Sequence, residues 1–207
     1  MQITSVLRRA VQVNPTGTAT IYQGRQQNWS QLLDRVQRLA GALQNIGMKP
    51  GDRVALLSLN SDRYIEYFFA TVWGGGAMMP MNIRWAPAEC AYALNDAGAE
   101  ILLVDEAFKD AAAAIQPDVA GLKTVIYCGD GDVPEGMHGY EQIIAAAEPA
   151  EDAGRADDDL AGIFYTGGTT GFPKGVMLSH TNFYVSGISN AQEIKLVDGT
   201  VYLHAAP

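Results

Sequence analysis

Short apolar runs alternate along the chain with longer stretches in which apolar residues recur every three or four positions. The beginning predicts a hairpin, with strands at 18–22 and 26–29 joined by a turn at Gly24. A helix is expected next, because Ser30 is a suitable N-cap and apolar residues at helical spacing follow it. Gly47 is expected to end this helix in the left-handed conformation that glycine tolerates.

After this helix the pattern becomes a regular alternation of strands and helices. The expected strands are 53–59, 77–81, 100–104 and 123–128. The expected helices begin at Asn60 or Ser61, at Pro87 and at Ala107, and end at Trp73, near Gly98 and at Ile115. Strands separated by helices imply βαβ units. The sequence therefore predicts an α/β fold, with a doubly wound, largely parallel sheet and flanking helices.

Two further segments bear on packing and on domain boundaries. An apolar stripe on the helix that ends at Trp73 is expected to pack in the core against the sheet. Its members are Tyr64, Ile65, Phe68, Phe69, Val72 and Trp73. Residues 148–159 are rich in acid, alanine and glycine and predict a solvated linker. This linker would separate an N-terminal α/β subdomain, 1–147, from the start of a second subdomain, 160–207.

Composition and charge narrow the functional classes. The 207 residues are 48% hydrophobic and 18% charged, as in soluble globular proteins, and carry a formal net charge of −9. A negative average field disfavours nucleic acid as a partner. No run approaches the roughly 18 apolar residues of a membrane span, so no integral membrane segment and a cytoplasmic location are expected. Cys90 and Cys128 are expected to be reduced, partly buried thiols.

One loop carries the clearest chemistry. An apolar strand, Leu160–Tyr165, leads into a run rich in glycine and threonine that ends with a lysine, and a second apolar run, 176–178, follows at once. Glycines let backbone N–H groups turn toward an anion, while threonine hydroxyls and the lysine add donors and charge. The spacing does not match a Walker A loop, and the loop joins strand to strand, so Lys174 and the hydroxyls must contribute more to phosphate binding. The residues expected to bind the phosphates are Thr166, Gly167, Gly168, Thr169, Thr170, Gly171 and Lys174.

The run YTGGTTGFPKGV resembles the phosphate-binding signature of the adenylate-forming superfamily, which includes acyl-CoA synthetases and aryl-CoA ligases. Gly167 stands where many members have serine, and this variant resembles that of fatty acyl-CoA ligases. Leu39–Leu56 and Asn60–Val104 are similar to scaffold segments of the family, and Val201–Pro207 resembles a strand that leads to the acyl pocket.

This resemblance implies the N-terminal portion of an ATP-dependent acyl-CoA ligase, an acid–thiol ligase. Such an enzyme activates a carboxylic acid, here a fatty acid, as acyl-AMP and transfers the acyl group to coenzyme A. ATP, Mg²⁺ and coenzyme A are the implied cofactors, and Thr169 or Thr170 would reach magnesium through the bound ATP. The catalytic lysine and the acyl pocket are expected beyond Pro207, so no catalytic residue is assigned and the chain alone is expected to be inactive.

Several alternatives stay open. The chain would also suit a stand-alone nucleotide- or phosphate-binding module without catalysis, an aryl-acid CoA ligase, or an interaction protein on an old fold. Relatives are often dimers, which makes a homodimer one alternative for the assembly. The three histidines show no metal-ligand spacing and are expected to be structural. Glu66 and Glu89 lack a partner acid at a defined spacing, and Arg84-Trp85 is interpreted as packing.

Overall fold

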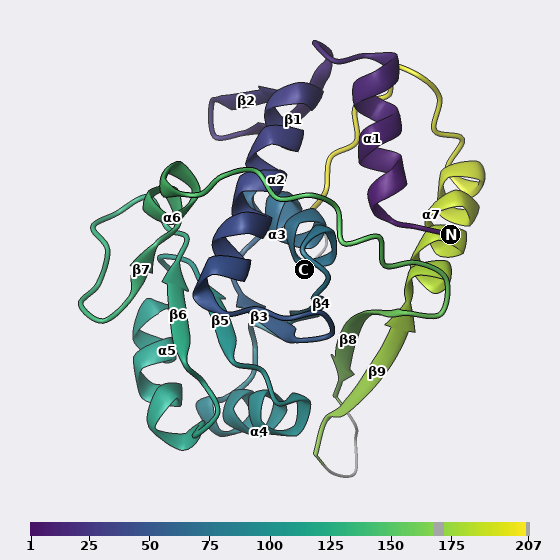
Figure 1. The fold of residues 1–207 in the computed structure, drawn as a ribbon. Helices are drawn as coiled ribbons and strands as arrows, with labels where there is room; N and C mark the ends of the chain where they lie inside the picture. The colour runs from purple at the N-terminus through teal and green to yellow at the C-terminus, as the bar shows by residue number, and fades with distance from the viewer. Residues whose placement is uncertain (168–171, 206–207) are drawn as a thin grey trace.

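A computed structural model describes residues 1–167 and 172–205 of the chain (Figure 1). The strands are β1 (Thr18–Tyr22), β2 (Arg25–Asn28), β3 (Arg53–Leu57), β4 (Ala77–Pro80), β5 (Ile101–Val104), β6 (Thr124–Tyr127), β7 (His138–Gly139), β8 (Leu160–Thr166) and β9 (Lys174–Ser179). The helices are α1 (Thr4–Val13), α2 (Trp29–Ile46), α3 (Asp62–Trp73), α4 (Pro87–Ala97), α5 (Lys109–Ile115), the 3-10 helix η1 (Gln116–Asp118), α6 (Tyr140–Ala146) and α7 (His180–Glu193). The predicted hairpin and the alternation that follows it are confirmed, with small shifts at the ends of the elements.

The central sheet has seven described strands in the order β7-β6-β5-β3-β4-β8-β9. All neighbours from β7 to β8 are parallel, and the last pair, β8 and β9, is antiparallel. From β3 the chain proceeds to β4 on one side and later to β5, β6 and β7 on the other. This reversal of direction is typical of a doubly wound sheet, so the predicted fold class is confirmed.

Both faces of this sheet are covered by helices. On β3, Val54 and Leu56 belong to a core cluster with buried residues of α2, α3 and α6, whereas Ala55 and Leu57 belong to a second cluster with α4 and α5. Successive strand residues point to opposite faces, so a strand covered on both sides is apolar throughout. Figure 1 shows α4 and α5 on the far side of the sheet from α2 and α3.

Helix α2 begins earlier than expected. Asn28, and not Ser30, is its N-cap: the Asn28 side chain accepts a hydrogen bond from the Gln31 amide at 2.8 Å. The Gln31 side chain accepts in return from the Asn28 amide at 2.9 Å. Such a reciprocal capping box satisfies two helix-end donors, which explains why Asn28 displaces Ser30 from this role. Gly47 ends the helix as predicted, with φ +115°.

The predicted apolar stripe on α3 is only partly in the core. Val72 and Trp73 are buried, but Ile65 is 37% exposed. The most enclosed aromatic side chain of the helix is Tyr67, which the stripe omitted. Its hydroxyl donates to the Val54 carbonyl at 2.6 Å, and this bond lets a phenol occupy the interface with the sheet. The buried face of α3 is therefore rotated relative to the predicted one.

Residues 148–159 are irregular and none of them is buried, but hydrogen bonds tie the first part of this segment to the rest of the chain. Trp73 Nε1 donates to the Ala150 carbonyl at 2.9 Å, and Thr4 Oγ1 donates to Asp152 at 2.7 Å. A Cβ at Gly41 would lie 2.3 Å from the Glu148 carbonyl oxygen, so glycine permits this close approach. The segment is therefore solvent-accessible, as expected of a linker, but anchored at these points, and the division into subdomains stays a prediction.

The last described residues form no strand. Residues 201–205 are irregular, and Leu203 is 86% exposed. The expected strand at Val201–Pro207 is therefore wrong for its described part, because no neighbouring strand among the described residues supplies hydrogen bonds to it. Within the described parts of the chain, no helix combines the length and the apolar character that crossing a membrane requires.

Candidate functional site

The candidate phosphate loop lies between the last two strands of the sheet, β8 and β9. These strands pair antiparallel, and Thr166 lies opposite Lys174 at the loop end of the ladder. The Thr166 hydroxyl donates to the Lys174 carbonyl at 3.5 Å, a long contact that leaves the hydroxyl available to a ligand. The loop therefore joins strand to strand, as the sequence predicts.

The two faces of this hairpin have different neighbours. Phe164 lies near the rings of Phe68 on α3 and Phe183 on α7, whereas Tyr165 packs on the side of α4. Alternate residues of a strand share a face, and residues directly opposite each other in the ladder do so too. Thr166 and Lys174 therefore lie on the face of Phe164, away from α4.

The predicted site residues that flank the loop are accessible. Thr166, Gly167 and Lys174 are exposed, and Lys174 forms no ion pair with another described residue. No described atom lies within 4 Å of a Cβ placed at Gly167, so a serine would fit there and the glycine leaves open space. An exposed ammonium group and an exposed, weakly bonded hydroxyl on one face suit phosphate oxygens.

The central predicted residues, Gly168, Thr169, Thr170 and Gly171, lie outside the described residues. Their phosphate contacts, and the contact of Thr169 or Thr170 with magnesium through ATP, stay predictions. Among the described residues, no group of three or more His, Cys, Asp or Glu side chains is placed to hold a metal ion. The exposed Thr166 hydroxyl suits a magnesium ion that is bound to phosphates, and the Lys174 ammonium suits the phosphate oxygens themselves.

Sequence reasoning missed two neighbours of the loop, Tyr92 and Asp96 of α4. Phe172 stacks on Tyr92 of α4, with ring centroids 4.6 Å apart. Tyr165 donates its hydroxyl proton to Asp96 of α4 at 2.6 Å, and Trp85 meets the Tyr165 ring edge-on at 6.2 Å. Burial, with the hydrogen bond to Asp96, raises the pKa of Tyr165. The contact of Trp85 agrees with its interpretation as packing, but no local pattern indicates partners so far apart in sequence.

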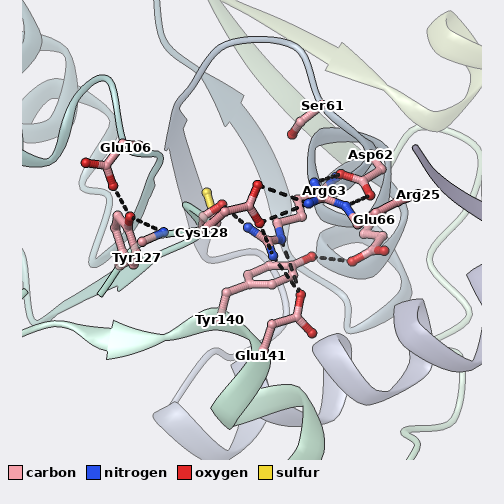
Figure 2. A network of polar contacts seen from close by, with 12 residues as sticks. Arg25, Ser61, Asp62, Arg63, Glu66, Glu106, Tyr127, Cys128, Tyr140 and Glu141 are labelled. Atoms are coloured by element: carbon pink, nitrogen blue, oxygen red, sulfur yellow. Dashed lines mark hydrogen bonds and ion pairs between the residues drawn. The ribbon is translucent and has the colours of Figure 1, made fainter. Parts of the chain in front are cut away.

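A second polar cluster surrounds Glu66, whose side chain is fully buried. Arg35 Nε donates to Glu66 at 2.7 Å, and Gln27 and the Tyr140 hydroxyl each donate to it at 2.7 Å. Figure 2 shows Tyr140 and Glu66 pointing toward one another. Burial raises the pKa of Tyr140 well above its usual value. Glu66 is thus a paired structural carboxylate and no free acid or base.

This cluster continues toward the surface through two more arginines (Figure 2). Arg25 bridges Asp62 at 2.8 Å and Asp130 at 3.0 Å, and Arg63 lies 2.9 Å from Asp130 and 3.1 Å from Glu141. The hydrogen bond from Arg25 lowers the pKa of Asp130. Because every charge here has a partner, the cluster joins the β1–β2 hairpin, α3, α6 and the turn after β6. It offers no free group for catalysis.

The remaining candidate groups are structural. Cys90 and Cys128 are free and buried, and burial raises their thiol pKa values to about 11 and about 12. His180 is fully buried at the start of α7, and burial lowers its pKa. The Glu89 carboxylate accepts from the Ala86 amide at 2.9 Å and so belongs to the N-terminal cap of α4.

Comparison with known proteins shows which family this chain belongs to. A family model described as AMP-binding enzyme matches residues 7–207. A long-chain-fatty-acid–CoA ligase of Thermus thermophilus is 35% identical over 83% of this chain and 30% of its own length. A feruloyl-CoA synthase of an Amycolatopsis species is 33% identical over 96% of this chain and 38% of its own length.

A solved structure extends the likeness to the fold. An anthranilate CoA ligase, AuaEII, crystallised with anthranoyl-AMP, has a TM-score of 0.86 and 26% identity over 91% of this chain and 36% of its own. The chain spans about a third of the length of the curated relatives it matches, and it corresponds to their N-terminal part.

Proposed function

Because the chain belongs to the AMP-binding enzyme family, we propose that it is the N-terminal portion of an ATP-dependent acyl-CoA ligase. The observation that carries the proposal is the β8–β9 hairpin, which presents the Thr166 hydroxyl and the Lys174 ammonium together on one exposed face. The family likeness runs from residue 7 to residue 207, so this hairpin is part of a matching scaffold and no isolated motif.

The chemistry explains why such a face is needed. A carboxylate is a poor electrophile, so its oxygen attacks the α-phosphorus of ATP, the bond to the bridging oxygen breaks and pyrophosphate leaves. The thiol of coenzyme A then attacks the acyl carbon and AMP leaves. The first step brings two anions together, so it requires positive charge and oriented donors around the phosphates. Lys174 supplies charge and Thr166 supplies a hydroxyl. Magnesium, when bound with the nucleotide, supplies further charge neutralisation.

A fatty acid is the proposed substrate. Gly167 leaves open space next to the loop, as in the glycine variant of fatty acyl-CoA ligases, and one relative is named for a long-chain fatty acid. Other relatives are named for feruloyl and anthranilate substrates, which keeps an aryl acid as the second candidate. The groups that bind the acid, the adenine ring and coenzyme A are proposed to lie in sequence that follows Pro207.

ATP–pyrophosphate exchange with a panel of fatty and aromatic acids tests this proposal. We expect exchange from a longer reading frame that contains this chain, with a preference for fatty acids, and none from the 207 residues alone. In the longer protein, Lys174→Ala should lower exchange by about tenfold or more, the loss of one charge-assisted phosphate contact. Lys49→Ala, which removes another exposed lysine, is the matched control and should leave exchange unchanged.

Each adverse result has a distinct meaning. Exchange by the 207-residue chain would refute the assignment as an inactive portion. No exchange from either protein with any acid would favour a nucleotide- or phosphate-binding module without catalysis. A preference for aromatic acids would replace the fatty-acid assignment with an aryl-acid ligase.

A further inference from the structure

Helix α4 contacts the chain on both sides of the phosphate loop. Tyr92 stacks on Phe172, which lies two residues before Lys174 on the C-terminal flank of the loop, at 4.6 Å between ring centroids and 23° between planes. Asp96 accepts the hydroxyl proton of Tyr165, just before the loop, at 2.6 Å. Tyr92 and Asp96 are four residues apart on the helix and so lie on one face of it. We call these two pairs, Tyr92–Phe172 and Asp96–Tyr165, the α4 clamp.

The stack with Tyr92 accounts for an otherwise unfavourable position. Phe172 is 70% exposed, and a large apolar ring at a loop is more stable when one of its faces is covered. Tyr92 provides that cover across the hairpin. The second pair holds over a wide pH range, because burial raises the pKa of Tyr165 and keeps its hydroxyl protonated as a donor.

Helix α4 is itself firmly held, so it can act as a base for the loop. Cys90 and Leu94 are buried against the sheet. Arg53 of β3 donates to the carbonyls of Ala97 and Gly98 at 2.6 and 2.9 Å and fixes the C-terminal end of the helix. A contact to a rigid element restricts its partner more than a contact to a mobile one.

The α4 clamp and the ligand-binding side chains lie on opposite faces of the hairpin. Tyr165 points toward α4, whereas Thr166 and Lys174 share the face of Phe164. The clamp therefore contacts the hairpin on its α4 side and leaves the face of Thr166 and Lys174 accessible to phosphates.

We propose that Tyr92 and Asp96 are positioning residues, which restrain the two flanks of the phosphate loop and so hold Thr166 and Lys174 in place for a nucleotide. This inference rests on the proposed function. Restraining these flanks reduces the conformational entropy that Thr166 and Lys174 lose when they bind phosphates, and so strengthens binding without any contact between the clamp and the ligand.

Hydrogen exchange of the 207-residue chain, read in peptides that cover residues 160–180, tests the clamp. It is measured without ligand and with increasing magnesium tripolyphosphate or MgATP. Tyr92→Ala should speed exchange in these peptides about three- to tenfold and raise the half-protecting ligand concentration by a similar factor, the size of one aromatic pair. Asp96→Ala should act in the same direction. Tyr92→Phe keeps the ring stack and should restore both values.

Tyr202→Ala removes an aromatic side chain that is 63% exposed and far in sequence from α4, and it serves as the matched control. The thermal midpoint should be the same for all variants, which separates positioning from global stability. The clamp is refuted if the wild-type chain responds to ligand but Tyr92→Ala changes neither the exchange rate nor the half-protecting ligand concentration. It is also refuted if Tyr92→Phe changes both values as much as Tyr92→Ala does. A wild-type chain that neither probe protects would instead contradict phosphate binding itself, and the positioning role with it.

Discussion

The two ends of the central sheet differ sharply in how well they are covered. In β3, four of the five residues are buried, and helices pack on both faces. In β9 no residue is buried, Met177 is 67% exposed, and His180 alone is buried among the described side chains of α7. The core clusters are built mainly from residues before 148, although buried Ala161 belongs to one of them, whereas the β8–β9 hairpin that carries the candidate site is largely exposed. The candidate site thus lies on the less covered end of the sheet, away from the best-packed strands.

The largest loss of stability is expected in the buried polar cluster around Glu66. Glu66→Ala would leave Arg35 and Tyr140 without their shared partner in a buried environment. Removing one member of a buried charge pair costs about 3–5 kcal/mol. Chemical denaturation should therefore show a large loss in the free energy of unfolding. Glu193→Ala, at the exposed end of α7, is the control and should change stability by about 0.5 kcal/mol or less.

Two leucines, one buried in the central sheet and one exposed near the end of the chain, test the difference in packing more directly. Leu102 is fully buried in β5, and Leu203 is 86% exposed. Leu102→Ala should lower the free energy of unfolding by about 2–5 kcal/mol, because it removes buried apolar surface and leaves a cavity. Leu203→Ala should have almost no effect. Equal losses in denaturant titrations would mean that the two regions do not differ in packing as described.

These contrasts also explain what the sequence can and cannot predict. The apolar runs of β3 and β5 are buried on both faces, so they were recognisable without any long-range information. Gly47 and Ser61 were recognisable for the same local reason, since caps depend on neighbouring residues. The flanks of the phosphate loop, Thr166 and Lys174, were found from their motif.

Features that depend on distant contacts were not predictable in this way. Tyr92 has no signal in its own helix that marks it as the partner of Phe172, because the two are brought together by the pairing of β8 with β4. The sequence showed only that Glu66 lacks a partner acid at a defined spacing. Its pairing with Arg35 and Tyr140 was not predictable, because these residues lie on other helices. The packing of the segment after Glu148 depends on the absent side chain of Gly41, which no local rule connects to it.

The less covered end of the sheet, together with α7, predicts self-association of the chain. Apolar side chains there are exposed, including Met177 at 67% and Ile188 at 49%. Exposed apolar patches favour association. Sedimentation velocity should show oligomers that increase with protein concentration. Ile188→Lys should reduce them. Ile21→Lys makes the same charge change at a residue of β1 that is 66% exposed, and should not. A chain that stays monomeric at all concentrations would contradict this expectation.

The smallest effect concerns the surface end of the polar cluster. The hydrogen bond from Arg25 lowers the pKa of Asp130 below its ordinary value of 3.8. A carboxylate whose folded pKa is lowered stabilises the fold above its unfolded pKa, and this contribution is lost as pH falls through the folded pKa. Asp130 is 53% exposed, so solvent screening limits the contribution to about 0.5 kcal/mol. Asp130→Asn should lower stability by this amount at pH 7 and by less below pH about 4. Asp198→Asn, at an exposed residue near the end of the chain, should show neither change when unfolding is followed across the same pH range. If Asp198→Asn shifts the acid dependence as much as Asp130→Asn does, the effect reflects the net charge of −9 and not the contact with Arg25.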